Sequence, residues 1–168
     1  MKALDLLRLA GFSLALLLVE QAIQLARPEW RSGSDVFLIW LVILSASRGP
    51  LIGAAFALAG GLFMDASSGH FAVFHLLYYF VPVALGTLFR SQLIVEYGLL
   101  GSVVAAGLLL GKILAMLLVG IMGGMLSGPG YLWDLNYWPL LVSSLVVFVA
   151  WRWLVGLARP LKAVSFGR

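Results

Sequence analysis

Long apolar runs, separated by short polar or glycine-containing breaks, constrain this chain more than any other feature of its sequence. The first run, Leu4–Ala26, is long enough to cross a bilayer as a helix, which takes about 20 residues. Five more apolar runs follow it: Val36–Ser47, Leu51–Met64, Phe71–Phe89, Ile94–Leu126 and Tyr137–Leu157. We therefore predict an all-α, polytopic transmembrane bundle of about six helices, formed by one integral membrane domain over residues 1–168.

The composition agrees with a membrane protein and excludes other classes. Of the 168 residues, 62% are hydrophobic and 11% are charged, whereas soluble domains have about 45–50% apolar and about 25% charged residues. The chain has no cysteine, which excludes disulfides, thiolate metal sites and cysteine catalysis. The net charge of +4 comes from basic residues between the apolar runs and at the ends. Because they form no run or stripe, we expect no nucleic-acid partner.

Glu20 and Lys112 each lie deep inside an apolar run. A charge at the centre of a membrane helix costs about 2.5–3.5 kcal/mol on the insertion scale. Because intramembrane charges usually pair within the bundle, we expect Glu20 and Lys112 to neutralise each other; the alternative is that a ligand or partner completes one of them. Glu20 also stands where a signal peptide would have a small-residue cleavage site, so we interpret the first run as an uncleaved anchor.

The second and third runs predict a compact helical hairpin. Each is short for a crossing, and together they exceed one crossing at about 1.5 Å per residue. The Arg-Gly-Pro sequence at 48–50 between them is typical of a turn. Gly53, Ala57 and Gly61 continue a four-residue spacing that begins at Gly49, which gives the third helix a small-residue face for close packing.

The stretch Gly60–His75 gathers an acid, two serines, glycines and histidines between apolar runs. We expect a helix to end at Met64 and the chain to turn over Asp65–Gly69. Asp65 would cap this turn by accepting hydrogen bonds from the amides of the serines that follow it. The alternative is a polar contact point for a partner at the membrane edge. Further along, Pro82 is predicted to kink the fourth run.

The sequence predicts neither a metal or cofactor site nor a set of catalytic residues. His70 and His75 are five residues apart, about 140° around a helix, whereas two metal ligands on a helix usually stand three or four apart. No glycine-rich phosphate loop, Gly-x-Ser-x-Gly elbow or His-Glu-x-x-His motif is present in the sequence. We therefore do not expect an enzyme.

The layout and one motif resemble the MreD family of bacterial rod shape-determining membrane proteins. The chain shares the family's size, its apolar segments, its short second and third helices and the turn Gly-Leu-Phe-Met-Asp-Ala-Ser-Ser-Gly-His. Val73 and Phe71 stand where the family has a glycine and frequently a proline. The positions that match the family's pattern are Asp65, Ser68, Gly69 and His75.

The resemblance implies a non-enzymatic scaffold in the bacterial cytoplasmic membrane. Its main partner would be the single-span protein MreC, with MreB, RodA and a class-B penicillin-binding protein as further members of the cell-wall elongation machinery. The family is similar in fold to the S components of energy-coupling-factor transporters, so the alternative is a vitamin-binding subunit. Such a subunit should have a small-residue stripe on its first helix, where this chain offers Ala22 and Ala26 at a spacing of four on an otherwise leucine-rich helix. The partner or structural candidates are Asp65, Ser68, Gly69, His75, Glu20, Lys112, Gly53, Ala57 and Gly61.

The distribution of basic residues predicts the orientation in the membrane, because basic residues concentrate in cytoplasmic loops. A six-helix orientation with the N-terminus inside puts eight of the basic residues on the cytoplasmic side: Lys2, Arg8, Arg48, Arg90, Arg152, Arg159, Lys162 and Arg168. A five-span orientation with the N-terminus outside also satisfies the rule, and both put the C-terminus in the cytoplasm.

A reporter enzyme that works only in the periplasm should therefore be silent when fused after Arg168. The same reporter fused before Met1 should be silent for six spans and active for five. Activity after Arg168 would show that both orientations are wrong.

Overall fold

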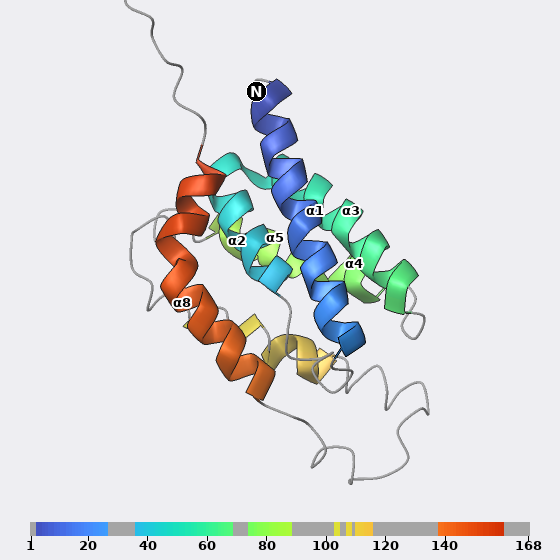
Figure 1. Ribbon diagram of the computed structural model, residues 1–168. Helices are drawn as coiled ribbons and strands as arrows, with labels where there is room; N and C mark the ends of the chain where they lie inside the picture. Colours follow the sequence, from blue (N-terminus) through green and yellow to red (C-terminus); the bar gives the residue numbers. More distant parts are fainter. Residues whose placement is uncertain are drawn as a thin grey trace, which may run out of the picture.

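The computed structural model describes residues 3–26, 36–68, 74–88, 103–104, 107–108, 110–115 and 138–159, and these are almost entirely helical (Figure 1). No strand is present among them, so the all-α prediction is confirmed. The helices are α1 (Ala3–Ala26), α2 (Val36–Arg48), α3 (Pro50–Ser68), α4 (Phe74–Tyr78), α5 (Phe80–Leu88) and α8 (Trp138–Ala158). Short helical pieces at 103–104, 107–108 and 110–115 belong to the fifth predicted run, the rest of which lies outside the described residues.

Helix α2 is the core of the structure. Every residue from Phe37 to Ala46 is buried, as expected for a helix with apolar side chains on all sides. Helices α1, α3, α5 and α8 all contact it, and Figure 1 shows it between α1 and α8. Its 13 residues extend only about 20 Å, less than the roughly 30 Å of a hydrocarbon core. The prediction of a short second helix is therefore confirmed.

A glycine turn joins α2 to α3. Gly49 has a φ of 96°, a conformation that glycine adopts without strain, and its N–H donates to the carbonyl of Ser45 at 2.9 Å. Pro50 then begins α3, where its fixed φ suits the first helical position and its missing N–H costs nothing. The hairpin predicted from the Arg-Gly-Pro sequence is confirmed.

Small residues let α3 approach its neighbours closely. A Cβ atom at Gly53 would lie 2.7 Å from the Cβ of Ser45 on α2, and one at Gly61 would lie 2.6 Å from the Cα of Leu76 on α4. Ala57, between the two glycines, is fully buried. The face marked by the four-residue spacing is therefore the face on which α3 packs.

Helix α3 is longer than predicted. It continues through Asp65 to Ser68, so the expected helix end at Met64 is wrong. Ser67 fits within the helix because its hydroxyl donates a hydrogen bond to the Phe63 carbonyl of the preceding turn at 2.7 Å. The Asp65 side chain, as described below, bonds to another helix.

The fourth predicted run is interrupted just before Pro82, where a kink was expected. Helix α4 ends at Tyr78 and α5 begins at Phe80, with Tyr79 between them in a turn. Pro82 explains the break, because a proline ring clashes with the carbonyl four residues earlier, here that of Tyr78. Residues 71–73 of this run lie outside the described residues.

In the part of the chain that the structure describes, two helices are long and apolar enough to cross a membrane, judged by length and composition. They are α1 over Ala3–Ile23, with a mean hydropathy of 1.7, and α3 over Pro50–Ser67, with a mean hydropathy of 1.4. Both expose large apolar side chains, as lipid-facing helices do; these include Leu4, Leu7, Leu14, Leu18, Leu51, Leu58 and Leu62.

The contact between α3 and α2 predicts that Gly53→Leu destabilises the protein. The new side chain would overlap Ser45 and Val83, and overpacking of this kind costs about 1–3 kcal/mol. Gly11→Leu is the matched control, because a Cβ at Gly11 on α1 meets nothing within 4 Å. Thermal unfolding in detergent should show a lower melting temperature for the first variant only. Equal melting temperatures would contradict the close packing.

Candidate functional site

Asp65 of α3 caps the start of α4. Its Oδ1 accepts a hydrogen bond from the backbone N–H of His75, and its Oδ2 accepts one from the N–H of Leu76, both at 2.9 Å. The first N–H groups of a helix have no acceptor within it, and a negative charge is favoured at that end. Asp65, which belongs to α3, therefore provides the acceptor for two N–H groups at the start of α4.

The ring of His75 belongs to the same arrangement. Its Nδ1 lies 2.9 Å from Asp65 Oδ1, within hydrogen-bonding distance. The ring also meets Phe74 and Tyr79 edge-on, at centroid distances of 5.3 and 5.7 Å. Both side chains of the pair are nearly buried, at 10% exposed for Asp65 and 4% for His75.

Gly61 and Asp65 act together on α4 because residues four apart share one face of a helix. Gly61 lets the backbone of α4 approach, and one turn later Asp65 bonds to its amides. The motif therefore joins α3 to α4 at close range.

The expected local turn at Asp65 is corrected by these bonds. The amides that it binds belong to His75 and Leu76, about ten residues later in the sequence, and not to the serines that follow it. Ser68 is the last residue of α3, while Gly69 and His70 lie outside the described residues. A role for Asp65 in partner binding stays a prediction. Among the described residues, no group of three or more His, Cys, Asp or Glu side chains could hold a metal ion.

A second polar cluster lies at the opposite end of α3. Arg48, the last residue of α2, forms a two-pronged ion pair with Asp5 of α1, with its two terminal nitrogens 2.5 and 2.9 Å from the carboxylate oxygens. Arg8, one turn after Asp5, contributes a longer contact of 3.3 Å to the same carboxylate. The Asp5 and Arg48 side chains are each only 6% exposed.

The two arginines also hold the end of α8. Arg48 donates to the carbonyls of Ala158 and Arg159 at 2.5 and 3.0 Å, and Arg8 donates to those of Leu157 and Arg159 at 2.7 and 3.0 Å. The last carbonyls of a helix have no partner within it, and the dipole there favours cations. We call Asp5, Arg8, Arg48 and the carbonyls of 157–159 the helix-end cluster.

Sequence reasoning missed the helix-end cluster. The charges were visible, and the spacing of Asp5 and Arg8 allows contact along one helix face. The decisive contacts join Arg48 to carbonyls 110 and 111 residues away. Backbone carbonyls leave no signal in a sequence, so only the folded chain shows them.

Glu20 caps α2 in the way that Asp65 caps α4. Its Oε2 accepts a hydrogen bond from the N–H of Val36, the first residue of α2, at 3.1 Å, and the side chain is buried. Lys112 is fully buried as well. Its segment is joined to α4 by the Tyr78 hydroxyl, which donates to the Leu108 carbonyl at 2.8 Å. The predicted pairing of Glu20 with Lys112 stays a prediction.

Comparison with known proteins returned no relative for this arrangement: no protein-family model matches the chain, and no curated protein or solved structure matches it.

The geometry at Asp65 predicts that even the isosteric change Asp65→Asn destabilises the protein. Asparagine has one side-chain oxygen in place of two, so one of the two oxygens that accept from His75 and Leu76 becomes an NH₂ group, which would face a donor. A buried donor left unpaired costs about 1–3 kcal/mol. Asp65→Ala, which leaves both amides unpaired, should melt at least as low.

Ser67→Ala is the control for Asp65→Asn, because the exposed Ser67 hydroxyl bonds only within α3. We expect its free energy of unfolding to change by no more than about 0.5 kcal/mol. If Asp65→Asn has the same melting temperature as the unchanged protein, one acceptor oxygen is enough to hold α4. The inference that both Asp65 oxygens are needed would then be wrong.

Proposed function

We propose that this chain is a non-enzymatic, multi-pass scaffold of the bacterial cytoplasmic membrane, similar to MreD, that binds MreC and supports the cell-wall elongation complex. The observation that carries the proposal is the set of bonds made by three acids that are buried or nearly buried. Asp5, Glu20 and Asp65 each bond to groups of this chain that lie at helix ends. These bonds hold the helices in fixed positions relative to one another, which is what a rigid binding platform requires.

The motif that resembles MreD supports the same function. Asp65 and His75, two of its matching positions, bond to each other and join α3 to α4. A carboxylate and a histidine could also form part of a catalytic relay. Here both carboxylate oxygens of Asp65 also accept hydrogen bonds from backbone N–H groups, so a structural role accounts for this residue. The His75 ring packs between the rings of Phe74 and Tyr79, which fits a structural role as well.

The helix-end cluster supports six crossings with the N-terminus inside. It brings the start of α1, the end of α2 and the end of α8 to one end of the bundle, together with Arg8, Arg48 and Arg159. Basic residues gathered at one end are expected on the cytoplasmic side. The turn at Gly49 favours two separate helices over the single long helix that five spans would need.

Co-purification tests the scaffold function. The chain, tagged at its C-terminus, is expressed with MreC from the same bacterium, extracted in mild detergent and captured through the tag. We expect MreC to be recovered with it at a comparable molar amount. An unrelated single-span protein, expressed at the same level, is the control and should stay in the unbound fraction.

Recovery of MreC no better than that of the control would contradict the scaffold function. A melting temperature that rises on addition of a water-soluble vitamin would indicate the S-component function instead, because a ligand that binds only the folded state stabilises it. The vitamins are added one at a time to the purified chain.

A further inference from the structure

Helix α1 exposes two neighbouring rows of leucines, each with a repeat of seven residues. Leu4, Leu18 and Leu25 belong to one row and Leu7 and Leu14 to the other, and each is between 51% and 78% exposed. Gly11 completes the first row, and a Cβ atom there would meet nothing within 4 Å. Gln21, which is partly exposed, continues the second row. We call the two rows together the α1 seam, which consists of Leu4, Leu7, Gly11, Leu14, Leu18, Gln21 and Leu25.

The spacing of the seam, alternately three and four residues, is the pattern by which two helices pack side by side along their length. Small residues lie on its flanks, where the exposed residues are Ala3, Ala10, Ala15 and Ala22. Small side chains beside the leucines let a second helix backbone approach closely. A surface that met only lipid would need apolar side chains but no division into central leucines and flanking alanines.

Gln21 places an unused hydrogen-bond acceptor at the seam. Its Nε2 donates to the Met64 sulfur at 3.0 Å, a weak acceptor, and its Oε1 accepts from no group in the described part of the chain. Gln21 lies about 9 Å along the axis from Ala15, the middle of the apolar run, which is within the roughly 15 Å half-thickness of the hydrocarbon. Lipid tails offer no donor, so another protein helix has to supply it.

A second copy of this chain supplies a donor at the required depth. Because the distribution of basic residues orients every copy in the same way, the α1 helices of two copies run parallel. A two-fold axis along the membrane normal then brings each seam residue opposite its counterpart. Gln21 therefore meets Gln21 of the partner subunit, and the NH₂ group of one amide can donate to the oxygen of the other.

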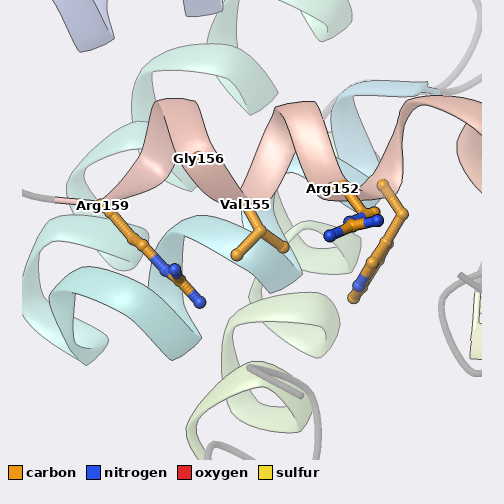
Figure 2. Close-up of a pocket in the computed structure, with 5 residues that line it drawn as sticks. Arg152, Val155, Gly156 and Arg159 are labelled. Carbon is orange, nitrogen blue, oxygen red and sulfur yellow. The ribbon is translucent and has the colours of Figure 1, made fainter. Parts of the chain in front are cut away.

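The outer face of α8 is less suited to such a pair. Figure 2 shows Arg152 and Arg159 on the same side of α8, with Val155 between them, where they line a pocket. Both arginines are exposed. Two copies that met at this face would bring like charges together, which opposes association. No residue of the α1 seam is charged.

We propose that the α1 seam is the interface of a parallel homodimer in the membrane, packed by leucines and joined by a hydrogen bond between the two Gln21 side chains. The proposal rests on the membrane-spanning placement of α1, which is part of the proposed function. It does not depend on the binding of MreC.

Disulfide cross-linking of the full chain in its membrane tests the position of the interface. The chain has no cysteine of its own, so a single introduced cysteine can link only to its counterpart in a second copy. A disulfide needs Cα atoms about 4.4–6.8 Å apart. We expect Leu14→Cys and Leu18→Cys to form cross-linked dimers on mild oxidation.

Leu6→Cys and Val19→Cys are the matched controls. These residues are 46% and 57% exposed, close to the 51% and 53% of Leu14 and Leu18, and lie on the same helix outside the seam and its flanks. Both control variants should stay monomeric under the same oxidation.

The contribution of Gln21 is measured by energy transfer between fluorescently labelled copies in dioleoyl phosphatidylcholine vesicles, as the protein is diluted with lipid. Gln21→Leu keeps an apolar side chain of similar size and removes the amide, so the dimer should dissociate about threefold more readily. Leu6→Ala should dissociate like the unchanged protein. The melting temperature of Gln21→Leu, measured in enough detergent to separate the copies, should hold, because the variant loses only the weak bond to sulfur within its own chain.

Four results would overturn the proposal. Cross-linking at Leu6→Cys or Val19→Cys as fast as at the seam would show random collision, and no cross-linking at any position would leave the seam to lipid. A seam cysteine that links to a cysteine placed in the span of MreC, and not to its own counterpart, would make MreC the occupant. Unchanged dissociation of Gln21→Leu would remove the hydrogen bond from the interface. Loss of MreC recovery while the seam still cross-links would contradict the scaffold function alone.

Discussion

The arrangement of this protein depends on the polar ends of α2, a helix whose sides are apolar all round. Its first N–H has no acceptor within the helix, and its last residue carries a nearly buried charge, so other helices supply the partners of both. Glu20 of α1 accepts from Val36 at one end, and at the other Arg48 pairs with Asp5. Asp5 and Glu20 are about 22 Å apart along α1, close to the length of α2, which is about 20 Å. Between them, Ser13 accepts from the Trp40 indole at 2.8 Å, so α1 lies antiparallel to α2 along its whole length.

The buried pair of Asp5 and Arg48 fixes position more than it adds stability. Removing water from two charges offsets much of their attraction, so exchanging such a pair for apolar residues is often neutral. Loss of one partner costs about 3–5 kcal/mol, because the other charge is left buried and unpaired. Any shift of α1 against α2 would separate the two charges and incur that cost. Because Arg48 also bonds to Ala158 and Arg159, the same restriction extends to α8.

Local chemistry predicted the helices better than it predicted their contacts. The bounds of α1, α2 and α8 agree with the apolar runs to within one residue, and glycine followed by proline marked the turn at Gly49. The end of α3 was wrong because Asp65, expected to turn the chain, bonds to amides of another helix. Glu20 stood out as a charge in an apolar run, yet its partner is the N–H of Val36, which no residue type reveals. Sequence shows which polar groups need a partner, and the fold decides which backbone groups provide it.

The charged side chains of the bundle match the helix ends that they meet. Glu20 and Asp65 accept from the first N–H groups of α2 and α4, the end at which a helix favours a negative charge. Arg8 and Arg48 donate to the last carbonyls of α8, the end at which a helix favours a positive charge. Each of these bonds therefore satisfies a backbone group that has no partner within its own helix and gives a buried or partly buried charge an opposite partial charge. Moving one helix against its neighbour would lose both at once, so these contacts fix the arrangement of the helices more strictly than apolar packing alone.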